Sequence, residues 1–350
     1  MLKRAKLTAL RLAESTGFSK LLQSSAWRRN RLLILCYHGI SKYDEHEWSN
    51  LYISPQMFRR RLESVAQACC NVLPLPEAIS RLANGSLPPR AVAITIDDGF
   101  HDFYSVAYPI LESFGYPVTL YLTTYYMEYN RPIFDPMVSY LLWMGRHRKQ
   151  IEWPEVFSEP ISLDHARSAI LNFALHKKLS GREKDDLLAR LARLLEIDYE
   201  DLCRKRVMHL ITPAEGRELA ARGVDFEYHT HRHRLYRRKE RMFQELDDNR
   251  SRIASISTAE PHHFCYTGGF YLPEHPGFLK DYGILSATTC EPGLCSQKSN
   301  PMLLPRLVDT MGLTDLEFRS WLSGTAAFMP KRNYEMTEGQ LAEEEEGAAT

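Results

Sequence analysis

The chain of 350 residues is 44% hydrophobic and 25% charged, which is typical of a soluble globular protein with a substantial core. Its 44 basic and 44 acidic residues cancel, so the overall charge indicates no nucleic-acid partner. No run of about 18 consecutive apolar residues occurs, and no transmembrane helix is therefore expected. The length allows either one large domain or two ordinary domains.

The cysteines and the N-terminus both bear on the compartment in which the chain works. The seven cysteines are odd in number and include no C-x-x-C pair, so they indicate neither a disulfide framework nor a cysteine zinc finger. Reduced thiols are typical of cytoplasmic proteins. The first 30 residues lack the continuous apolar core of a signal peptide. These features predict a cytoplasmic protein.

Residues 1–30 are predicted to form a basic amphipathic N-terminal arm. Its apolar residues are spaced for one helical face, namely Leu7, Leu10, Phe18, Leu21 and Leu22. Its basic residues are Lys3, Arg4, Lys6, Arg11, Lys20, Arg28 and Arg29. Two interpretations remain open. The arm packs on the protein's own body, which we favour, or it makes a peripheral contact with the anionic inner membrane surface.

After the arm, strands and helices alternate as in a parallel α/β protein. In chain order, the pattern predicts a strand over residues 31–40, helices over 55–70 and 76–82, a strand over 91–100, a helix over 107–114 and a strand over 118–124. His38 lies at the end of the first of these strands, and Asp97 and Asp98 lie at the end of the second.

Residues 125–210 are helical and polar in pattern, and we interpret them as an insertion between strands of the main domain. The elements predicted after this insertion are a helix over residues 213–222, a strand over 224–230, a helix over 236–257, a strand over 263–267 and a strand–helix pair over 303–322. Residues 331–350 are predicted to be an acidic disordered tail.

The first candidate for chemistry is the sequence Asp97-Asp98-Gly99. Two adjacent carboxylates at the end of an apolar strand are costly to bury unless a metal or a proton offsets their repulsion. Because adjacent strand residues point in opposite directions, one carboxylate is expected to coordinate a metal and the other to act on a bound water. An ordinary turn is the structural alternative for an isolated Asp-Asp-Gly.

The second candidate is the sequence of residues 229–233, His-Thr-His-Arg-His, which directly follows an apolar strand. Two histidines four residues apart meet on one side of a helical turn and can ligate one metal. With Asp98, His229 and His233 would form a set that leaves positions open for water and substrate. His231 is expected to point elsewhere, and a solvated basic loop is the alternative.

These residues, in this order, resemble the polysaccharide deacetylase family (the NodB-homology group, carbohydrate esterase family four). The family's T-F-D-D-G motif is matched by residues 95–99 and its H-[ST]-x-x-H motif by residues 229–233. The resemblance implies an α/β fold, a distorted (β/α)₇ barrel over residues 31–330, with the helical insertion at about 125–210. It also implies a metal, Zn²⁺ or another divalent ion, at the carboxyl ends of the strands.

The resemblance implies a role for each matching residue. Asp97 would be the catalytic base, while Asp98, His229 and His233 would hold the metal. His38 matches the histidine that serves as general acid in branches with an amino-terminal Y-H-x motif.

The third motif, F-x-Y-P-x-G in such branches, is matched with changes by residues 264–269. Tyr266, Thr267 and Gly268 would face the substrate and stabilise the oxyanion, with Thr267 in the place of the proline. The arginine that orients the base in other branches is missing from this motif. We hypothesise that Arg306 supplies the missing charge.

The implied activity is removal of N-acetyl groups from an N-acetylhexosamine-containing polysaccharide or its lipid-linked precursor, as in exopolysaccharide biosynthesis. The partner would be an N-acetylated glycan. Two alternatives remain. The same site suits a deformylase acting on a sugar-lipid or a sugar-nucleotide. The altered third motif suits a catalytically weak glycan-binding relative.

Overall fold

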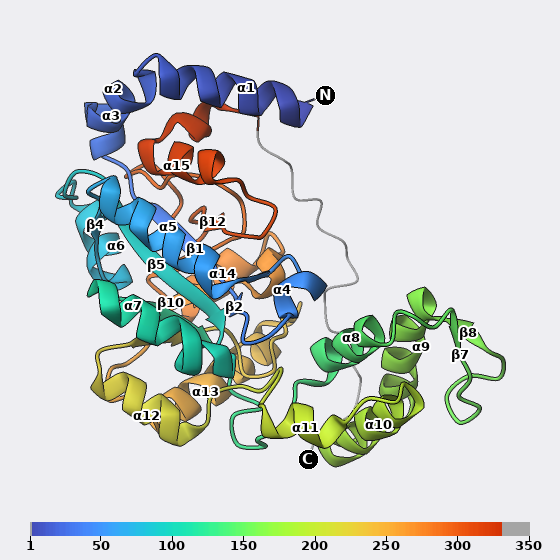
Figure 1. The fold of residues 1–350 in the computed structure, drawn as a ribbon. Helices are drawn as coiled ribbons and strands as arrows, with labels where there is room; N and C mark the ends of the chain where they lie inside the picture. Colours follow the sequence, from blue (N-terminus) through green and yellow to red (C-terminus); the bar gives the residue numbers. More distant parts are fainter. Residues whose placement is uncertain (1, 331–350) are drawn as a thin grey trace. The chain divides into compact units, whose positions relative to one another are not determined.

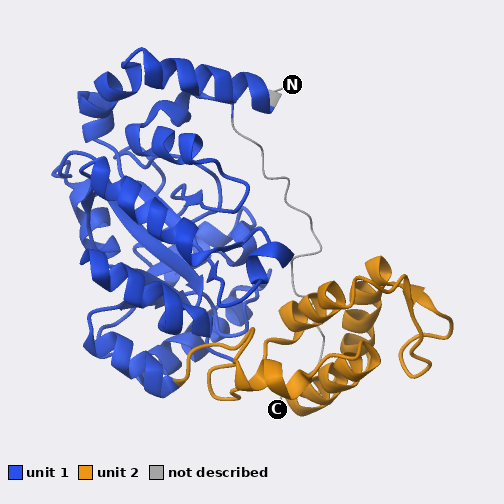
Figure 2. Ribbon diagram, in the orientation of Figure 1, with its two compact units in different colours: residues 1–125, 213–350 blue, residues 126–212 orange. Residues whose placement is uncertain are grey.

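The computed structural model describes residues 2–330, which form two compact units (Figure 2). Unit 1 comprises residues 2–125 and 213–330, and unit 2 comprises residues 126–212. The tail predicted over residues 331–350 lies outside the described residues. Within the described part of the chain, no helix is long and apolar enough to cross a membrane.

Unit 1 is built around a curled sheet in which every strand pair is parallel (Figure 1). The strands follow the order β11-β10-β9-β6-β5-β1-β12, and β4 (Asn71–Val72) pairs with the beginning of β5. Their bounds are β1 Leu33–Tyr37, β5 Ala91–Asp98, β6 Thr119–Leu122, β9 Asp225–Tyr228, β10 His263–Cys265, β11 Ser286–Thr288 and β12 Leu307–Val308. The expectation of a distorted seven-stranded deacetylase barrel is confirmed.

One segment connects the two edges of this curled sheet. Leu304 forms a parallel bridge with Thr288 of β11, and Leu307 pairs with Leu35 of β1. The chain between Leu304 and Leu307 therefore runs from one edge strand to the other. Because Arg306 lies in this segment, it lies within the sheet rather than in an exposed loop.

Helices surround the sheet of unit 1 (Figure 1). Their bounds are α5 Pro55–Gln67, α6 Leu75–Ala83, α7 Tyr108–Phe114, α12 Pro213–Ala221, α13 Lys239–Ala254, α14 His275–Tyr282 and α15 Asp315–Ser323. The start predicted for the helix over residues 55–70 is confirmed, and the Ser54 side chain caps it by accepting a hydrogen bond from the Met57 N–H. After β1, the short elements β2 (Gly39–Ile40), α4 (Glu45–Trp48) and β3 (Tyr52–Ile53) lead to α5.

The N-terminal arm forms three helices, α1 (Leu2–Ser15), α2 (Phe18–Ser24) and α3 (Ala26–Arg29). Helices α1 and α2 pack against α15, and the Leu10 side chain is fully buried. Lys6 Nζ lies 3.0 Å from Glu317 Oε1, and the Arg319 guanidinium binds both carboxylate oxygens of Glu14 at 2.9 and 3.2 Å. The arm thus packs on the body of unit 1, as the favoured interpretation predicted.

Unit 2 is mainly helical, with α8 (Phe134–Met144) packed against both α9 (Leu163–His176) and α10 (Gly181–Leu194). Helix α10 begins with a capping box in which Ser180 and Glu183 satisfy each other's backbone N–H groups. The unit also contains α11 (Tyr199–Arg204) and a short antiparallel pair, β7 (Gln150–Ile151) with β8 (Ile161–Ser162). In the chain, this unit lies between β6 and α12.

Candidate metal centre and catalytic site

Three of the predicted site residues meet at the carboxyl ends of β5 and β9. Asp98 Oδ1 lies 3.2 Å from His229 Nε2 and 3.3 Å from His233 Nε2. One ligand atom of each residue lies within 4.8 Å of the other two. His229 is buried whereas the His233 side chain is 47% exposed, so solvent reaches one side of the cluster. Two imidazoles and one carboxylate suit Zn²⁺ and similar divalent metals and leave positions open.

Hydrogen bonds to the ring Nδ1 side and to the backbone N–H fix the orientation of His229. Its Nδ1 lies 2.9 Å from the Cys265 carbonyl oxygen, so an N–H at Nδ1 donates to that carbonyl and the Nε2 edge of the ring faces Asp98. The backbone N–H of His229 donates to Asn249 Oδ1 at 3.2 Å. Asn249 is fully buried, and its amide nitrogen donates to the Leu122 carbonyl and to Thr124 Oγ1.

Residues 229–233 do not form the helical turn that we predicted. They leave β9 as an irregular loop, with left-handed φ angles of 62° at Thr230 and 57° at His233. The loop is held by hydrogen bonds from the Thr124 and Tyr125 N–H groups to the His231 carbonyl, at 3.2 and 2.9 Å. The His231 ring lies 2.8 Å from Thr124 Oγ1, away from the cluster, as expected. Loop geometry rather than helical spacing therefore brings the two outer histidines together.

A sharp turn ends β5. Asp98 has a left-handed φ of 73°, which costs a non-glycine residue about 1 kcal/mol or more and is found preferentially at functional sites. Gly99 follows with φ of 86°, and a Cβ there would lie 2.3 Å from Leu122 Cδ1. Only glycine fits at this position, and the turn directs the Asp98 carboxylate toward the two histidines.

Asp97, next to the candidate metal ligand Asp98, makes a buried bidentate ion pair with Arg306. The two contacts are Nη1 to Oδ1 at 2.7 Å and Nη2 to Oδ2 at 2.8 Å. Arg306 is itself fixed by donating to the Thr289 carbonyl and to Thr95 Oγ1. Burial raises the pKa of Asp97, but the charge and hydrogen bonds of Arg306 outweigh it and hold that pKa well below its ordinary range. Arg306 thus lies where our hypothesis required a positive charge.

His38 lies on the other side of the same carboxylate. Its Nε2 is 3.7 Å from Asp97 Oδ2, and its side chain is mostly buried. Burial lowers the pKa of His38, while the charges of Asp97 and Asp98 raise it only in part. The His38 imidazole is therefore mainly neutral near pH 7.

Two thiols for which we predicted no role from the sequence also lie beside Asp97. Cys36 Sγ lies 3.5 Å and Cys265 Sγ lies 3.4 Å from Asp97 Oδ2. Burial raises the pKa of both thiols, so they are protonated and can donate weak hydrogen bonds to the carboxylate. Their only sequence signal was position, because Cys36 precedes His38 by two residues and Cys265 lies inside the third motif.

The third motif contacts the site through Cys265, whose carbonyl faces His229 and whose thiol faces Asp97. The Tyr266 ring is fully buried and packs on Phe264 and Tyr271, so the structure does not present this ring to a substrate. A short turn over Thr267–Gly269 follows β10. Its first hydrogen bond runs from the Gly269 N–H to the Tyr266 carbonyl, so the N–H groups of Thr267 and Gly268 precede it and the turn does not use them.

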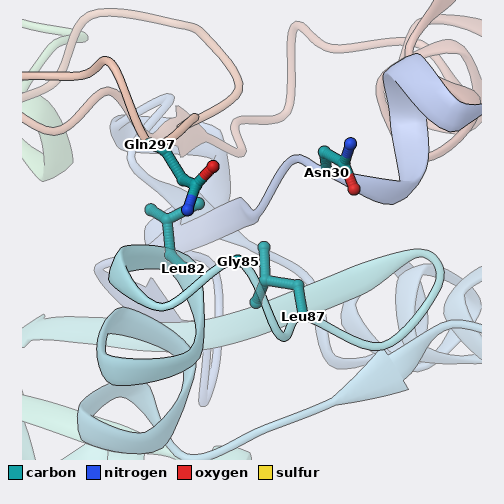
Figure 3. Close-up of a pocket in the computed structure, with 5 residues that line it drawn as sticks. All are labelled: Asn30, Leu82, Gly85, Leu87 and Gln297. Atoms are coloured by element: carbon teal, nitrogen blue, oxygen red, sulfur yellow. The ribbon is translucent and has the colours of Figure 1, made fainter.

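The pocket drawn in Figure 3 belongs to the other end of the strands. It is lined by Asn30, Leu82, Gly85, Leu87 and Gln297. Asn30 precedes β1 and Leu87 precedes β5, whereas the candidate ligands follow strand ends. This pocket is therefore separate from the candidate metal centre.

A parallel barrel with an Asp-His-His cluster and a paired carboxylate at the carboxyl ends of its strands defines a class of hydrolase. The family described as "Polysaccharide deacetylase" matches residues 84–157 and 176–286, just over half of the chain. The chain belongs to this family.

Comparison with individual proteins agrees with this assignment. A poly-β-1,6-N-acetyl-D-glucosamine N-deacetylase from Staphylococcus epidermidis is 28% identical over 109 residues, which cover 28% of this chain and 38% of that protein. The chain thus matches well under two thirds of this relative's length.

Two solved structures share the fold. The Streptococcus pyogenes deacetylase PplD, in complex with acetate, is 18% identical with a TM-score of 0.52, over 79% of this chain and 91% of that one. IcaB from Ammonifex degensii is 15% identical with a TM-score of 0.51, over 85% and 98%. At these identities the two likenesses show the fold alone.

Proposed function

We propose that the chain is a metal-dependent hydrolase that removes N-acetyl groups from an N-acetylhexosamine-containing polysaccharide or its lipid-linked precursor. The observation that carries this proposal is the pair of neighbouring carboxylates with different partners. Asp97 is kept ionised by Arg306, while Asp98 faces His229 and His233. The name of the Staphylococcus epidermidis relative supports an N-acetylglucosamine polymer as the substrate class.

The metal would be held by Asp98, His229 and His233, whose nitrogen and oxygen donors favour Zn²⁺ but also suit other divalent transition metals. When bound, such an ion polarises the acetyl carbonyl and lowers the pKa of water.

The remaining steps belong to side chains and backbone groups of this chain. Asp97 accepts a proton from the attacking water as the new carbon–oxygen bond forms. The N–H groups of Thr267 and Gly268 stabilise the negative charge that develops on the acetyl oxygen. His38 Nε2, 3.7 Å from Asp97 Oδ2, takes up that proton and gives it to the sugar nitrogen as the carbon–nitrogen bond breaks. The products are acetate and a free amino sugar.

The test is acetate release from oligomers of β-1,6-linked N-acetylglucosamine, measured on the full chain before chelation, after chelation and after Zn²⁺ is added back. The proposal predicts release that stops with the chelator and returns with the metal. β-1,4-linked oligomers serve as a comparison for linkage, and the Asp97→Asn variant controls for contaminating activity.

Other results would favour the alternatives. Formate release from N-formylated sugars, without acetate release from any N-acetylated oligomer, would indicate a deformylase. Metal and glycan binding without release of either acid would indicate a glycan-binding relative.

A further inference from the structure

The N-terminal arm has a second face, opposite the one that packs on α15. In α1, the exposed residues Arg4, Thr8, Arg11, Leu12 and Ser15 follow helical spacing. The packed face instead carries the buried Leu10 and the ion pair between Lys6 and Glu317. The sequence therefore provides α1 with two different faces, and only one of them is used within unit 1.

The outer face of the arm exposes large apolar side chains. Leu21 is 74% exposed and Leu12 is 63% exposed, which makes them the two most exposed large hydrophobic residues of the described chain. Phe18, at the start of α2, is also exposed. Single exposed apolar residues need no explanation, but here three of them lie within ten residues of a short arm.

The exposed charge of the arm is positive at every residue except Glu14. The exposed basic residues are Lys3, Arg4, Arg11, Lys20 and Arg29. Glu14 is the single acidic residue within residues 1–30, and its carboxylate is engaged by Arg319. The exposed apolar residues therefore lie among basic side chains, and the one carboxylate of the arm is already paired with Arg319.

The exposed apolar and basic residues together favour one kind of binding partner for the outer face of the arm. A second copy of the chain would bring an equally positive face against the first, which like-charge repulsion opposes. An anionic lipid surface instead offers opposite charge to the basic side chains and an apolar interior to the leucines and the phenylalanine.

We propose that the outer face of the arm docks on an anionic membrane surface, with Leu12, Phe18 and Leu21 inserted at the boundary between headgroups and acyl chains. Lys3, Arg4, Arg11, Lys20 and Arg29 contact the lipid headgroups. The contact is peripheral and reversible, because each basic residue near such a surface contributes only about 1 kcal/mol, or about fivefold in affinity.

The experiment is co-sedimentation of the full-length protein with vesicles of phosphatidylcholine alone or of phosphatidylcholine mixed with phosphatidylglycerol. We expect binding to the anionic vesicles only, and weaker binding as salt is added. Replacing the three apolar residues by serine (Leu12→Ser, Phe18→Ser, Leu21→Ser) should reduce binding at least about tenfold, because the inserted side chains are lost. The charge variant Arg4→Gln, Arg11→Gln, Lys20→Gln should do the same.

Two matched variants change exposed residues elsewhere. Leu285→Ser with Leu175→Ser controls for apolar exposure, and Arg60→Gln, Arg193→Gln, Arg237→Gln controls for total charge. Both should bind vesicles as the unchanged protein does. Since none of the substituted arm residues is buried, acetate release from soluble oligomers should be unchanged and shows that each variant is folded.

Three outcomes would overturn the proposal. The first is equal binding to neutral and anionic vesicles, or none to either. The second is full binding by the two arm variants. The third is self-association in sedimentation velocity that the arm variants lose while no form binds vesicles, which would assign the face to a second copy.

Discussion

Asp97 and Asp98 are neighbours in the chain, yet their partners separate their roles. Asp97 lies inside the barrel between Arg306 and two thiols, whereas Asp98 turns toward His229 through a left-handed backbone. Hydrogen bonds from His229 and His233 outweigh the burial that raises the pKa of Asp98, and its pKa lies well below the ordinary range. Both carboxylates are therefore ionised, and only their surroundings distinguish the proposed base from the proposed metal ligand.

Substitutions of Asp97 and of His229 should separate these two roles. Asp97→Asn should retain the metal but lose about 10²–10⁴-fold in turnover, because the proton acceptor is gone while the ligand set remains. His229→Ala should lose both metal and activity. Metal content and acetate release, measured on the same preparations, decide the matter, and bound metal also shows that Asp97→Asn has folded. Normal turnover by Asp97→Asn would rule out this residue as the base.

Arg306 is predicted to be a positioning residue that sets the pKa of Asp97. In Arg306→Ala, burial remains but the opposing charge is lost, so the pKa of Asp97 rises, by about 1–3 units for a carboxylate that loses an arginine partner. The acidic limb of the pH–rate profile should move to higher pH by a similar amount. Arg306→Lys should recover part of the shift. An unchanged profile in Arg306→Ala would show that the pair does not control the base.

Asn249 is predicted to position His229 as a ligand. It joins the His229 N–H to the Leu122 carbonyl, so Asn249→Ala removes the group that holds the start of the histidine loop. Loss of such outer hydrogen bonds typically weakens metal affinity about 10–100-fold. Competition with a chromophoric chelator measures the effect, and Arg250→Ala, on the exposed side of the same helix, is the control. Equal affinities in Asn249→Ala and the unchanged protein would contradict this role.

The residues of the site differ in how readily sequence predicts them. Asp97, Asp98, His229 and His233 stand in short motifs, and the structure brings the last three together. Asn249, Cys36 and Cys265 lie in no motif of their own, because their roles depend on which segments the fold places side by side. No local pattern in the sequence records that information.

At the scale of elements, long apolar runs and helix caps were sufficient signals. Strand β5 and helices α5, α6 and α12 lie within three residues of their predicted bounds. Strand β11 was missed because it has three residues, Ser-Ala-Thr, without an apolar run, and its polar side chains are buried by their neighbours. Tertiary contacts, rather than the local pattern, determine this strand.

The pairing of β10 with β11 is expected to weaken in acid because of His263. Its Nδ1 lies 2.8 Å from Ser286 Oγ across the two strands, and burial lowers the pKa of His263 to about 4 from 6.5. The unfolded chain therefore binds a proton at a higher pH than the folded one. The free energy of unfolding is therefore highest above the pKa of His263 in the unfolded chain. It decreases as the pH falls toward 4, by at most about 3 kcal/mol.

The measurement compares urea midpoints at about pH 7 and about pH 5. His263→Asn should lose less stability between the two than the unchanged protein does, because asparagine cannot be protonated there. His262→Asn, at the adjacent exposed position, should lose as much as the unchanged protein. If His263→Asn and the unchanged protein lost the same stability between the two pH values, His263 would not contribute to the loss of stability in acid.

At the scale of the whole molecule, sequence predicted the class of fold through its motifs but not how the segments join. The strand order and the path of residues 304–308 across both edges of the sheet depend on pairings between distant segments. The same is true of the arm, whose amphipathic pattern fitted either packing or membrane contact. The structure assigns the inner face to α15 and leaves the outer face exposed.

Arg28 ties the end of the arm to the barrel. Its guanidinium is fully buried and donates to the carbonyls of Leu322, Arg31 and Ala91, at 2.9, 2.7 and 3.4 Å. Those carbonyls belong to α15, the approach to β1 and the first residue of β5. Burial lowers the pKa of Arg28 to about 10, which still leaves it charged near pH 7.

Arg28→Met should therefore destabilise unit 1 rather than only release the arm. It fills much of the same space but leaves two buried carbonyls and one partly buried carbonyl without their donor, a loss of about 2–4 kcal/mol. Arg29→Met, exposed on the same short helix, should stay within about 0.5 kcal/mol. Urea unfolding followed by far-ultraviolet circular dichroism and by residual acetate release distinguishes the two cases. Since Ala91 begins the strand that ends at Asp97 and Asp98, both signals should fall together at a lower urea concentration. If only vesicle binding changed, the arm would be a detachable appendage and Arg28 a local anchor.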